Sequence, residues 1–211
     1  MANIIPDFAF RRHFLFAGFA TILAIVSPAL SKAANVSNEL ATQEMVIGHP
    51  DAPVTIIEYA SLGCSHCASF HQNTYPEIKK TYIDTGKVKL IYRDYPLGTP
   101  ALAASMISRC GGPSKYFGMV DIFFRSQRQW ASSENPINAL GQMARFGGMS
   151  TDDINACLQN QALMDHIQGV AKHGQDKFDV NSTPTFIIDD EKIEGAQNFE
   201  TFKKIIDKAL N

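Results

Sequence analysis

Two cysteines that lie two residues apart constrain the fold of this chain more than any other feature of its sequence. Cys64 and Cys67 follow the apolar run from Val54 to Ala60 and open a segment, residues 64–85, that reads as a helix. A strand, a turn and a helix that begins at a thiol form the layout of a dithiol redox site. Because a helix N-terminus has unpaired N–H groups and a partial positive charge, it stabilises a thiolate. We therefore predict a lowered pKa for Cys64, with His66, when protonated, adding positive charge nearby.

The same pair of cysteines is compatible with half of a zinc site. Such a site needs a second pair of ligands at regular spacing, and the other cysteines, Cys110 and Cys157, are isolated and distant. His71 falls on the same face of the predicted helix as Cys64 and Cys67, so a metal site stays open as an alternative, as does a purely structural bridge. We expect redox chemistry and no metal.

The N-terminal residues have the features of a secretory signal. Arg11 and Arg12 precede an apolar run at residues 14–26, and small residues follow at 31–33. Basic, apolar and small-residue regions in this order predict a signal peptide over residues 1–33. The arginine pair also fits twin-arginine export, so that route, the general secretory route and an uncleaved anchor all remain open. The four cysteines all follow this segment, which suits an oxidising compartment.

The charge balance argues against nucleic acid as a partner. The chain has 19 lysines and arginines against 21 aspartates and glutamates, a formal net charge of −2. Nucleic-acid-binding domains carry a basic surplus, and this sequence has none. Residues 34–211 are enough for one ordinary domain with a substantial hydrophobic core.

One carboxylate interrupts the apolar run before the cysteines. Val54 to Ala60 is otherwise nearly all apolar, as in a strand that is covered on both faces, but it contains Glu58. A buried carboxylate is costly unless it has a partner or a task. We expect Glu58 to be a proton acceptor behind the dithiol; the alternative is a strand end close to solvent.

The rest of the chain predicts an α/β fold with a helical insertion. The helix over 64–85 should be kinked at Pro76 and should end at Gly86, and a strand over 87–93 should complete a right-handed parallel crossover. Helical patterns alone fill residues 99–179, which suggests a separate helical lobe. The sheet then resumes with further expected elements: strands over 184–188 and 192–194, a tight turn at 189–190, and a last helix after 198.

Three stretches together resemble the bacterial periplasmic thiol-disulfide oxidoreductases of the DsbA type. Residues 52–59 lead into residues 63–67 as in that family's first strand and active-site helix, and residues 182–186 resemble its cis-proline loop. The resemblance implies a thioredoxin fold, a central mixed sheet flanked by helices, with an all-helical lobe inserted. Its first half would span 44–98, the insertion 99–179 and its second half 180–211.

The resemblance also implies the site residues. Cys64 would be the nucleophile and Cys67 its buried partner, with Glu58 as the buried acid. Pro184 would be cis, which would leave the backbone of Thr183 beside the dithiol to bind an extended substrate. Two departures concern the redox preference: the central dipeptide is Ser65-His66 where many members have Pro-His, and Thr183 before the proline is as similar to disulfide isomerases as to oxidases.

The function implied is oxidation of dithiols in newly exported proteins in the periplasm. The enzyme would be a monomer without a cofactor beyond its redox-active disulfide, and a quinone-linked membrane protein of the DsbB type would reoxidise it. Two alternatives stay open: an isomerase or reductase on the same fold, and a non-catalytic metal-binding thiol module.

The two remaining cysteines are expected to form a structural disulfide. Cys110 and Cys157 are left together once Cys64 pairs with Cys67, and each falls on the apolar stripe of its predicted helix. In an oxidising compartment two such thiols in contact should not stay reduced. The alternative is two separate buried thiols.

Overall fold

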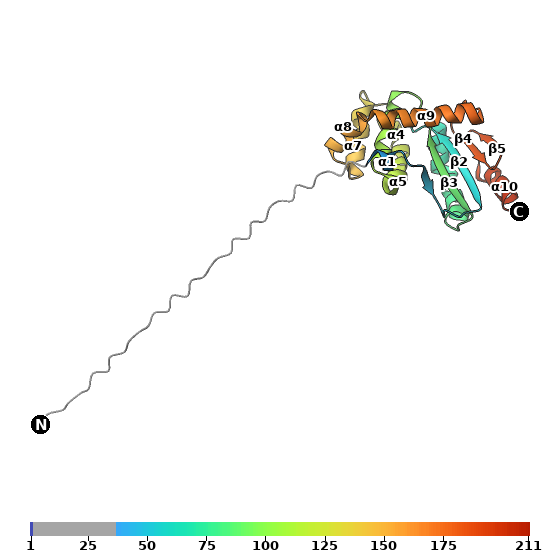
Figure 1. Ribbon diagram of the computed structural model, residues 1–211, viewed down its shortest axis with the longest axis horizontal. Helices are drawn as coiled ribbons and strands as arrows, with labels where there is room; N and C mark the ends of the chain where they lie inside the picture. Colours follow the sequence, from blue (N-terminus) through green and yellow to red (C-terminus); the bar gives the residue numbers. More distant parts are fainter. Residues whose placement is uncertain (2–36) are drawn as a thin grey trace. The chain divides into compact units, whose positions relative to one another are not determined.

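A mixed five-stranded sheet forms the centre of the protein in the computed structural model, which describes Met1 and residues 37–211. The signal peptide predicted at 1–33 therefore lies outside the described residues, apart from Met1. The strand order is β1-β3-β2-β4-β5 (Figure 1). Strands β2 and β3 are parallel and the other neighbours are antiparallel, so the predicted parallel crossover is confirmed. The strands are β1 Met45–Ile47, β2 Val54–Ala60, β3 Val88–Asp94, β4 Thr185–Ile188 and β5 Glu191–Glu194.

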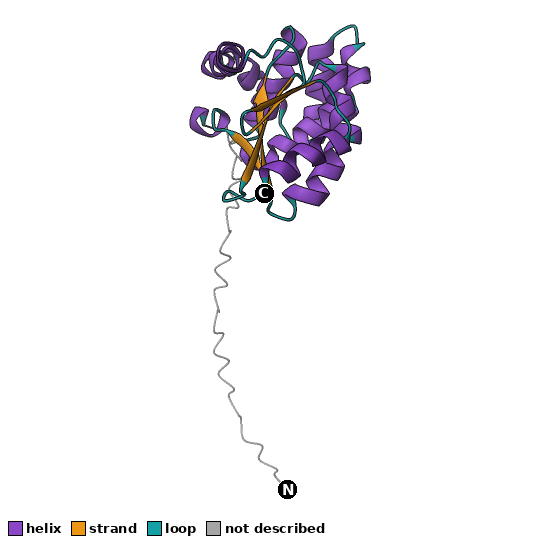
Figure 2. Cartoon of the chain, turned by 90° about the vertical axis from the view of Figure 1, so that its right-hand side faces the viewer, coloured by secondary structure: helices purple, strands orange, loops and turns teal. Residues whose placement is uncertain are grey.

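Helices cover both sides of this sheet (Figure 2). On one face of β2, Ile56 belongs to the main hydrophobic core together with residues of α2, α3 and α10. On the other face, Tyr59 packs with Phe178 at the end of α9. Burial on both faces explains why β2 reads as a continuous apolar run rather than an alternating one. These helices are α2 Ser65–Asn73, α3 Tyr75–Ile78, α9 Gln161–Phe178 and α10 Phe199–Ala209.

The helix predicted over 64–85 is broken into three pieces. Helix α2 ends at Asn73, α3 follows, and a π-helical turn, η1 (Lys79–Ile83), leads to Gly86. Pro76 has no N–H to donate back into α2, so it sits in the first turn of α3 instead. The kink expected at Pro76 is thus a break between two helices.

The insertion is helical throughout, as predicted. The expected N-caps are present: the side chain of Asn135 accepts from the N–H of Asn138, and Ser150 accepts from Asp153. Two short helices, α1 and α6, were not predicted. The main core extends without interruption from the sheet into the insertion. The helices not yet given are α1 Asn38–Ala41, α4 Thr99–Cys110, α5 Pro113–Arg125, α6 Gln127–Ala131, α7 Pro136–Phe146 and α8 Thr151–Leu158.

A buried ion pair joins the insertion to the sheet. Arg109 of α4 donates to Asp94 at the end of β3 over 2.6 Å, and both side chains are almost fully buried. The same guanidinium donates to the carbonyls of Ala41 and Gln43, and Tyr116 of α5 donates to the Asp94 carboxylate. These contacts hold α4, α5 and the N-terminal segment against one strand end. None of the helices in residues 37–211 is long and apolar enough to cross a membrane.

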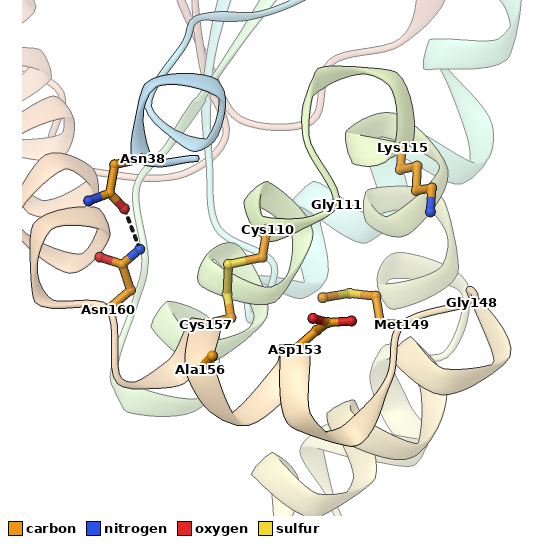
Figure 3. A pocket seen from close by; sticks show the side chains of 10 residues that line it. All are labelled: Asn38, Cys110, Gly111, Lys115, Gly148, Met149, Asp153, Ala156, Cys157 and Asn160. Carbon is orange, nitrogen blue, oxygen red and sulfur yellow. Dashed lines mark hydrogen bonds between the residues drawn. A yellow bond between two sulfur atoms is a disulfide. The ribbon is translucent and has the colours of Figure 1, made fainter. Parts of the chain in front are cut away.

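The structure contains a disulfide between Cys110 and Cys157, the pairing expected from the sequence. It joins the end of α4 to α8, with 6.0 Å between the two Cα atoms. Both cysteines line a surface pocket of 370 Å³ (Figure 3). At its edge the Asn160 side chain donates to Asn38 over 2.6 Å, which attaches α1 to the start of α9.

The first prediction concerns close packing between α9 and β2. A Cβ added at Gly174 would overlap the Tyr59 ring, which is fully buried and cannot retreat because Arg93 donates to its hydroxyl over 2.8 Å. Gly174→Ala should therefore destabilise the protein by roughly 1–3 kcal/mol in thermal or denaturant unfolding. Gly169→Ala on the same helix meets open space and should stabilise by up to about 1 kcal/mol. Equal effects of the two changes would contradict this account.

The second prediction concerns the disulfide. Cys110 and Cys157 are 47 residues apart in sequence, so loop-closure entropy assigns the bridge about 4 kcal/mol at most. A Cys110→Ser, Cys157→Ser double variant should melt at a lower temperature and still react through Cys64. A folded double variant whose Cys64 no longer reacts with a disulfide reagent would show that the bridge has more than a structural role.

Candidate active site

Cys64 is the residue that caps the N-terminus of α2. It has an extended backbone and immediately precedes Ser65, the first helical residue. The preceding turn is held by the buried Ser61 hydroxyl, which accepts from the N–H groups of Gly63 and Leu97 over 3.2 and 3.1 Å. Gln127, from the short helix α6, donates its side-chain amide to the carbonyls of Leu62 and Cys64. The position of the sulfur is therefore fixed from both the sheet and the insertion.

The pKa of Cys64 is lowered to about 5, the direction predicted from the sequence. The largest cause is a hydrogen bond from the Cys67 thiol; partial burial opposes the shift, and Thr183 and the backbone N–H groups of Cys67 and His66 add to it. The half-buried thiol is therefore a thiolate at neutral pH. His66 takes part through its backbone N–H, while the residue itself is exposed to solvent.

Cys67 has the opposite properties. Its side chain is fully buried, and burial raises its pKa well above the usual value. The hydrogen bond to Cys64 and the negative charges of Cys64 and Glu58 raise it further. The two thiols of one helical turn thus differ strongly in acidity, with one an anion and the other a hydrogen-bond donor to it.

The segment before β4 also lies beside Cys64. The Thr183–Pro184 peptide bond is cis, and both residues are buried. The Thr183 carbonyl accepts from the Cys64 thiol over 3.2 Å. The Thr183 hydroxyl has no other partner among the described residues, and as a donor it lowers the pKa of Cys64. Thr183 therefore offers an acceptor to the thiol and a donor to the thiolate.

Glu58 lies deep in the protein rather than at a solvent-exposed strand end. Its side chain is fully buried, and His71 Nε2 lies 2.9 Å and 3.1 Å from its two carboxylate oxygens. Its charge raises the pKa of Cys67, and its role as a proton acceptor stays a prediction. His71, considered from the sequence as a metal ligand, instead contacts this carboxylate. The described residues contain no group of three histidines, cysteines or acidic residues arranged to hold a metal ion.

Two features of this site were not predicted from the sequence. Gln127 sits in a polar stretch, residues 125–129, that reads as solvated surface, and no periodic pattern marks its amide as buried. The pairing of His71 with Glu58 was missed because it joins a helix to a strand. The position of His71 on the cysteine face of α2 was the one available signal.

Comparisons with known proteins agree on one family. A family model described as thioredoxin matches residues 40–208. The crystal structure of alpha-DsbA1 from Wolbachia pipientis is 34% identical, covers 83% of this chain and 96% of that one, and superposes with a TM-score of 0.74. BdbD from Bacillus subtilis, at 23% identity, superposes with a TM-score of 0.72 and shows the same fold.

Curated relatives carry names from the same chemistry. A protein of Rickettsia conorii, provisionally named a protein-disulfide oxidoreductase, is 32% identical over 87% of this chain. The alignment covers 66% of that relative, so this chain spans about two thirds of its length. Disulfide bond formation protein D of Bacillus subtilis is 24% identical over 78% of this chain and 76% of its own length.

The third prediction is that one thiol of the reduced protein, Cys64, titrates at low pH. Thiolate absorbance of the reduced protein should rise with a midpoint near 5, from Cys64. Cys67→Ala should raise this pKa more than Thr183→Val does, because the hydrogen bond from Cys67 is the largest cause of the shift. A Cys64 that titrates like free cysteine in the wild-type protein would contradict the site described here.

The same shift predicts a pH-dependent stability. The folded-state pKa is lowered, so the thiolate stabilises the reduced protein above the unfolded-state value of about 8.5. This contribution is lost as the pH falls towards 5. The melting temperature of the reduced protein relative to the oxidised one should therefore fall on acidification, since a disulfide does not titrate.

Proposed function

Because this chain belongs to the DsbA-type protein-disulfide oxidoreductases of the thioredoxin superfamily, we propose that it introduces disulfides into exported proteins through Cys64 and Cys67. The observation that carries this proposal is the difference in acidity between the two thiols. A sulfur that is stable as a thiolate is a good leaving group, so the disulfide that contains it is easily reduced. An enzyme of this kind passes its disulfide to other proteins.

The exchange takes two steps. A substrate thiolate attacks Cys64, the more exposed sulfur, which forms a mixed disulfide and releases Cys67 as a thiolate. Cys67 takes up one proton, which Glu58 helps to deliver. A second substrate thiolate then attacks the substrate sulfur of the mixed disulfide and releases Cys64 as a thiolate. The substrate loses two electrons and two protons, and the enzyme gains two electrons and one proton.

The cis-proline segment is suited to binding a substrate in an extended conformation. The backbone of Thr183 lies beside Cys64, with its carbonyl already in hydrogen-bond contact with the sulfur. An extended peptide can pair with such a backbone segment in the manner of an added strand. Pairing of this kind uses main-chain groups, so it suits substrates of many sequences, such as unfolded or folding proteins with reduced cysteines.

The reduced enzyme then needs an oxidant. We assign this role to a quinone-linked membrane protein of the DsbB type, in the periplasm, acting on a monomeric enzyme whose redox group is its own disulfide. In that reaction the Cys64 thiolate attacks a disulfide of the partner. Cys67 gives up its proton and attacks Cys64, which releases the partner as a dithiol.

A second candidate is an isomerase or reductase on the same fold. The observation that favours it is Thr183 before the cis-proline, a residue as similar to isomerases as to oxidases. The two activities differ in the stability of the enzyme's disulfide, so the redox potential separates them.

The fifth prediction is the redox potential of the Cys64–Cys67 couple. Equilibration with glutathione should give the Cys64–Cys67 couple a value above about −200 mV, whereas reductants of the thioredoxin type lie near about −270 mV. Two electrons are transferred with one proton at neutral pH, so the potential should fall by about 30 mV per pH unit between pH 6 and 8.

The control is oxidation of a peptide with two cysteines by the stoichiometric oxidised protein. Cys64→Ser should abolish this oxidation and the Cys110→Ser, Cys157→Ser variant should retain it. A potential near the thioredoxin value would favour the reductase. Absence of peptide oxidation together with tightly bound metal in anaerobically purified protein would favour the metal-binding module.

A further inference from the structure

The Glu58 carboxylate has one partner, and that partner is a histidine. Both oxygens of Glu58 lie within 3.1 Å of the same atom, His71 Nε2. Within residues 37–211 no other group donates to this carboxylate. The Glu58 side chain is fully buried, so the position and the charge of its carboxylate both depend on the imidazole.

An aromatic cage fixes the orientation of the His71 ring. Phe124 of α5 stacks on it, with 4.5 Å between ring centroids and 25° between planes. Phe70, Tyr75 and Tyr92 contact it from α2, α3 and β3. A ring held in this way cannot turn its Nε2 away from Glu58 without disturbing four neighbours.

The cage still leaves the imidazole in contact with water. The side chain of His71 is 8% exposed, whereas that of Glu58 is 0% exposed. The Nδ1 atom has no hydrogen-bond partner among the described residues. The fully buried side-chain atoms without a partner in the described residues are Tyr92 Oη, Ser105 Oγ and Thr183 Oγ1. Nδ1 is not one of them, so it is not fully buried. Proton exchange between the pair and solvent can therefore take place at Nδ1.

The charged and titratable groups facing this ring come from each element packed against it. Glu58 lies on β2 and Cys67 lies on α2 with His71. Burial raises the pKa of Tyr75 and of Tyr92, so neither phenol loses its proton near neutral pH. Helix α5 contributes Phe124 to the ring, and its charged residues Asp121 and Arg125 form an exposed pair with each other.

We propose that His71 is a positioning residue of the dithiol exchange: it holds the Glu58 carboxylate behind Cys67 and compensates its charge. This inference rests on the proposed function. With a protonated ring the Glu58–His71 pair is neutral. When the ring gives its Nδ1 proton to water, the pair carries one negative charge.

That charge matters because Cys67 becomes a thiolate twice in each cycle. Cys67 leaves as a thiolate when a substrate attacks Cys64, and it attacks as a thiolate when the enzyme is reoxidised. A second buried anion beside it opposes both events. The charge on the imidazole therefore acts on the Cys67 steps through Glu58, and it leaves the Cys64 thiolate in place.

The experiment measures resolution of a mixed disulfide by Cys67. Reduced protein is mixed with an activated disulfide peptide, and the release of the peptide thiol from Cys64 is followed by stopped flow between pH 5 and 8.5. The rate and its dependence on pH are compared between wild type and a variant without the imidazole. His71→Gln retains an amide donor for Glu58 but cannot become charged, so it should resolve the mixed disulfide about tenfold more slowly at the acid end and give a different pH profile.

Two controls isolate the effect. His166→Gln makes the same chemical change at a half-buried histidine of α9 and should keep the wild-type profile. The thiolate absorbance of Cys64 should keep its midpoint near 5 in His71→Gln, because His71 is not among the causes of that shift. An unchanged pH profile in folded His71→Gln would overturn the proposal.

A double-mutant cycle tests whether His71 acts through Glu58. Glu58→Gln alone should also change the pH profile, and the double variant Glu58→Gln, His71→Gln should be no slower than Glu58→Gln. Additive losses would overturn the proposal. If His71→Gln does not fold, Glu58→Gln decides alone, since a wild-type pH profile in that variant would exclude the pair. A wild-type protein that resolves the mixed disulfide but fails to oxidise a dithiol peptide would contradict the proposed function and leave this inference standing.

Discussion

One negative charge, on the sulfur of Cys64, is the feature that the surrounding structure must hold in a fixed place. The groups that lower its pKa come from different parts of the chain: the first turn of α2 gives backbone N–H groups and the Cys67 thiol, and the segment before β4 gives Thr183. These parts meet because β2 lies between β3 and β4 in the sheet. The topology of the sheet is therefore part of the electrostatics of the site.

The helical insertion serves the same site from the other side. Gln127 binds two carbonyls of the turn that carries Cys64, so α6 fixes the backbone from which the sulfur projects. Arg109 and Asp94 fix the insertion in turn, since this ion pair joins α4 to the end of β3. Burying such a pair costs desolvation free energy, and removing one partner would leave the other charge unpaired. The insertion can contribute to the site only while this junction is intact.

The features of this structure that depend on neighbouring residues in the chain could be predicted from the sequence. The cysteine pair after an apolar run, the carboxylate within that run and the N-caps at Asn135 and Ser150 all follow from neighbours in the chain. Contacts made in tertiary structure were out of reach, because a polar residue such as Gln127 has the same local pattern whether its amide faces solvent or a buried carbonyl. The continuous helix over 64–85 failed for a related reason: Pro76 can kink a helix or begin a new one, and packing decides between them.

Cys64 and Cys67 lie in different environments because the two thiols have opposite requirements for acidity. Cys64 must be stable as a leaving group, which requires donors and partial exposure. Cys67 keeps its proton until it attacks, because burial raises its pKa and the negative charges of Cys64 and Glu58 raise it further. A buried carboxylate would be unstable alone in the protein core. His71 Nε2 lies within 3.1 Å of both oxygens of Glu58, so the imidazole stabilises the carboxylate. The same helix that begins at the reactive sulfur therefore also carries, two turns later, the partner of the acid whose charge acts on the second thiol.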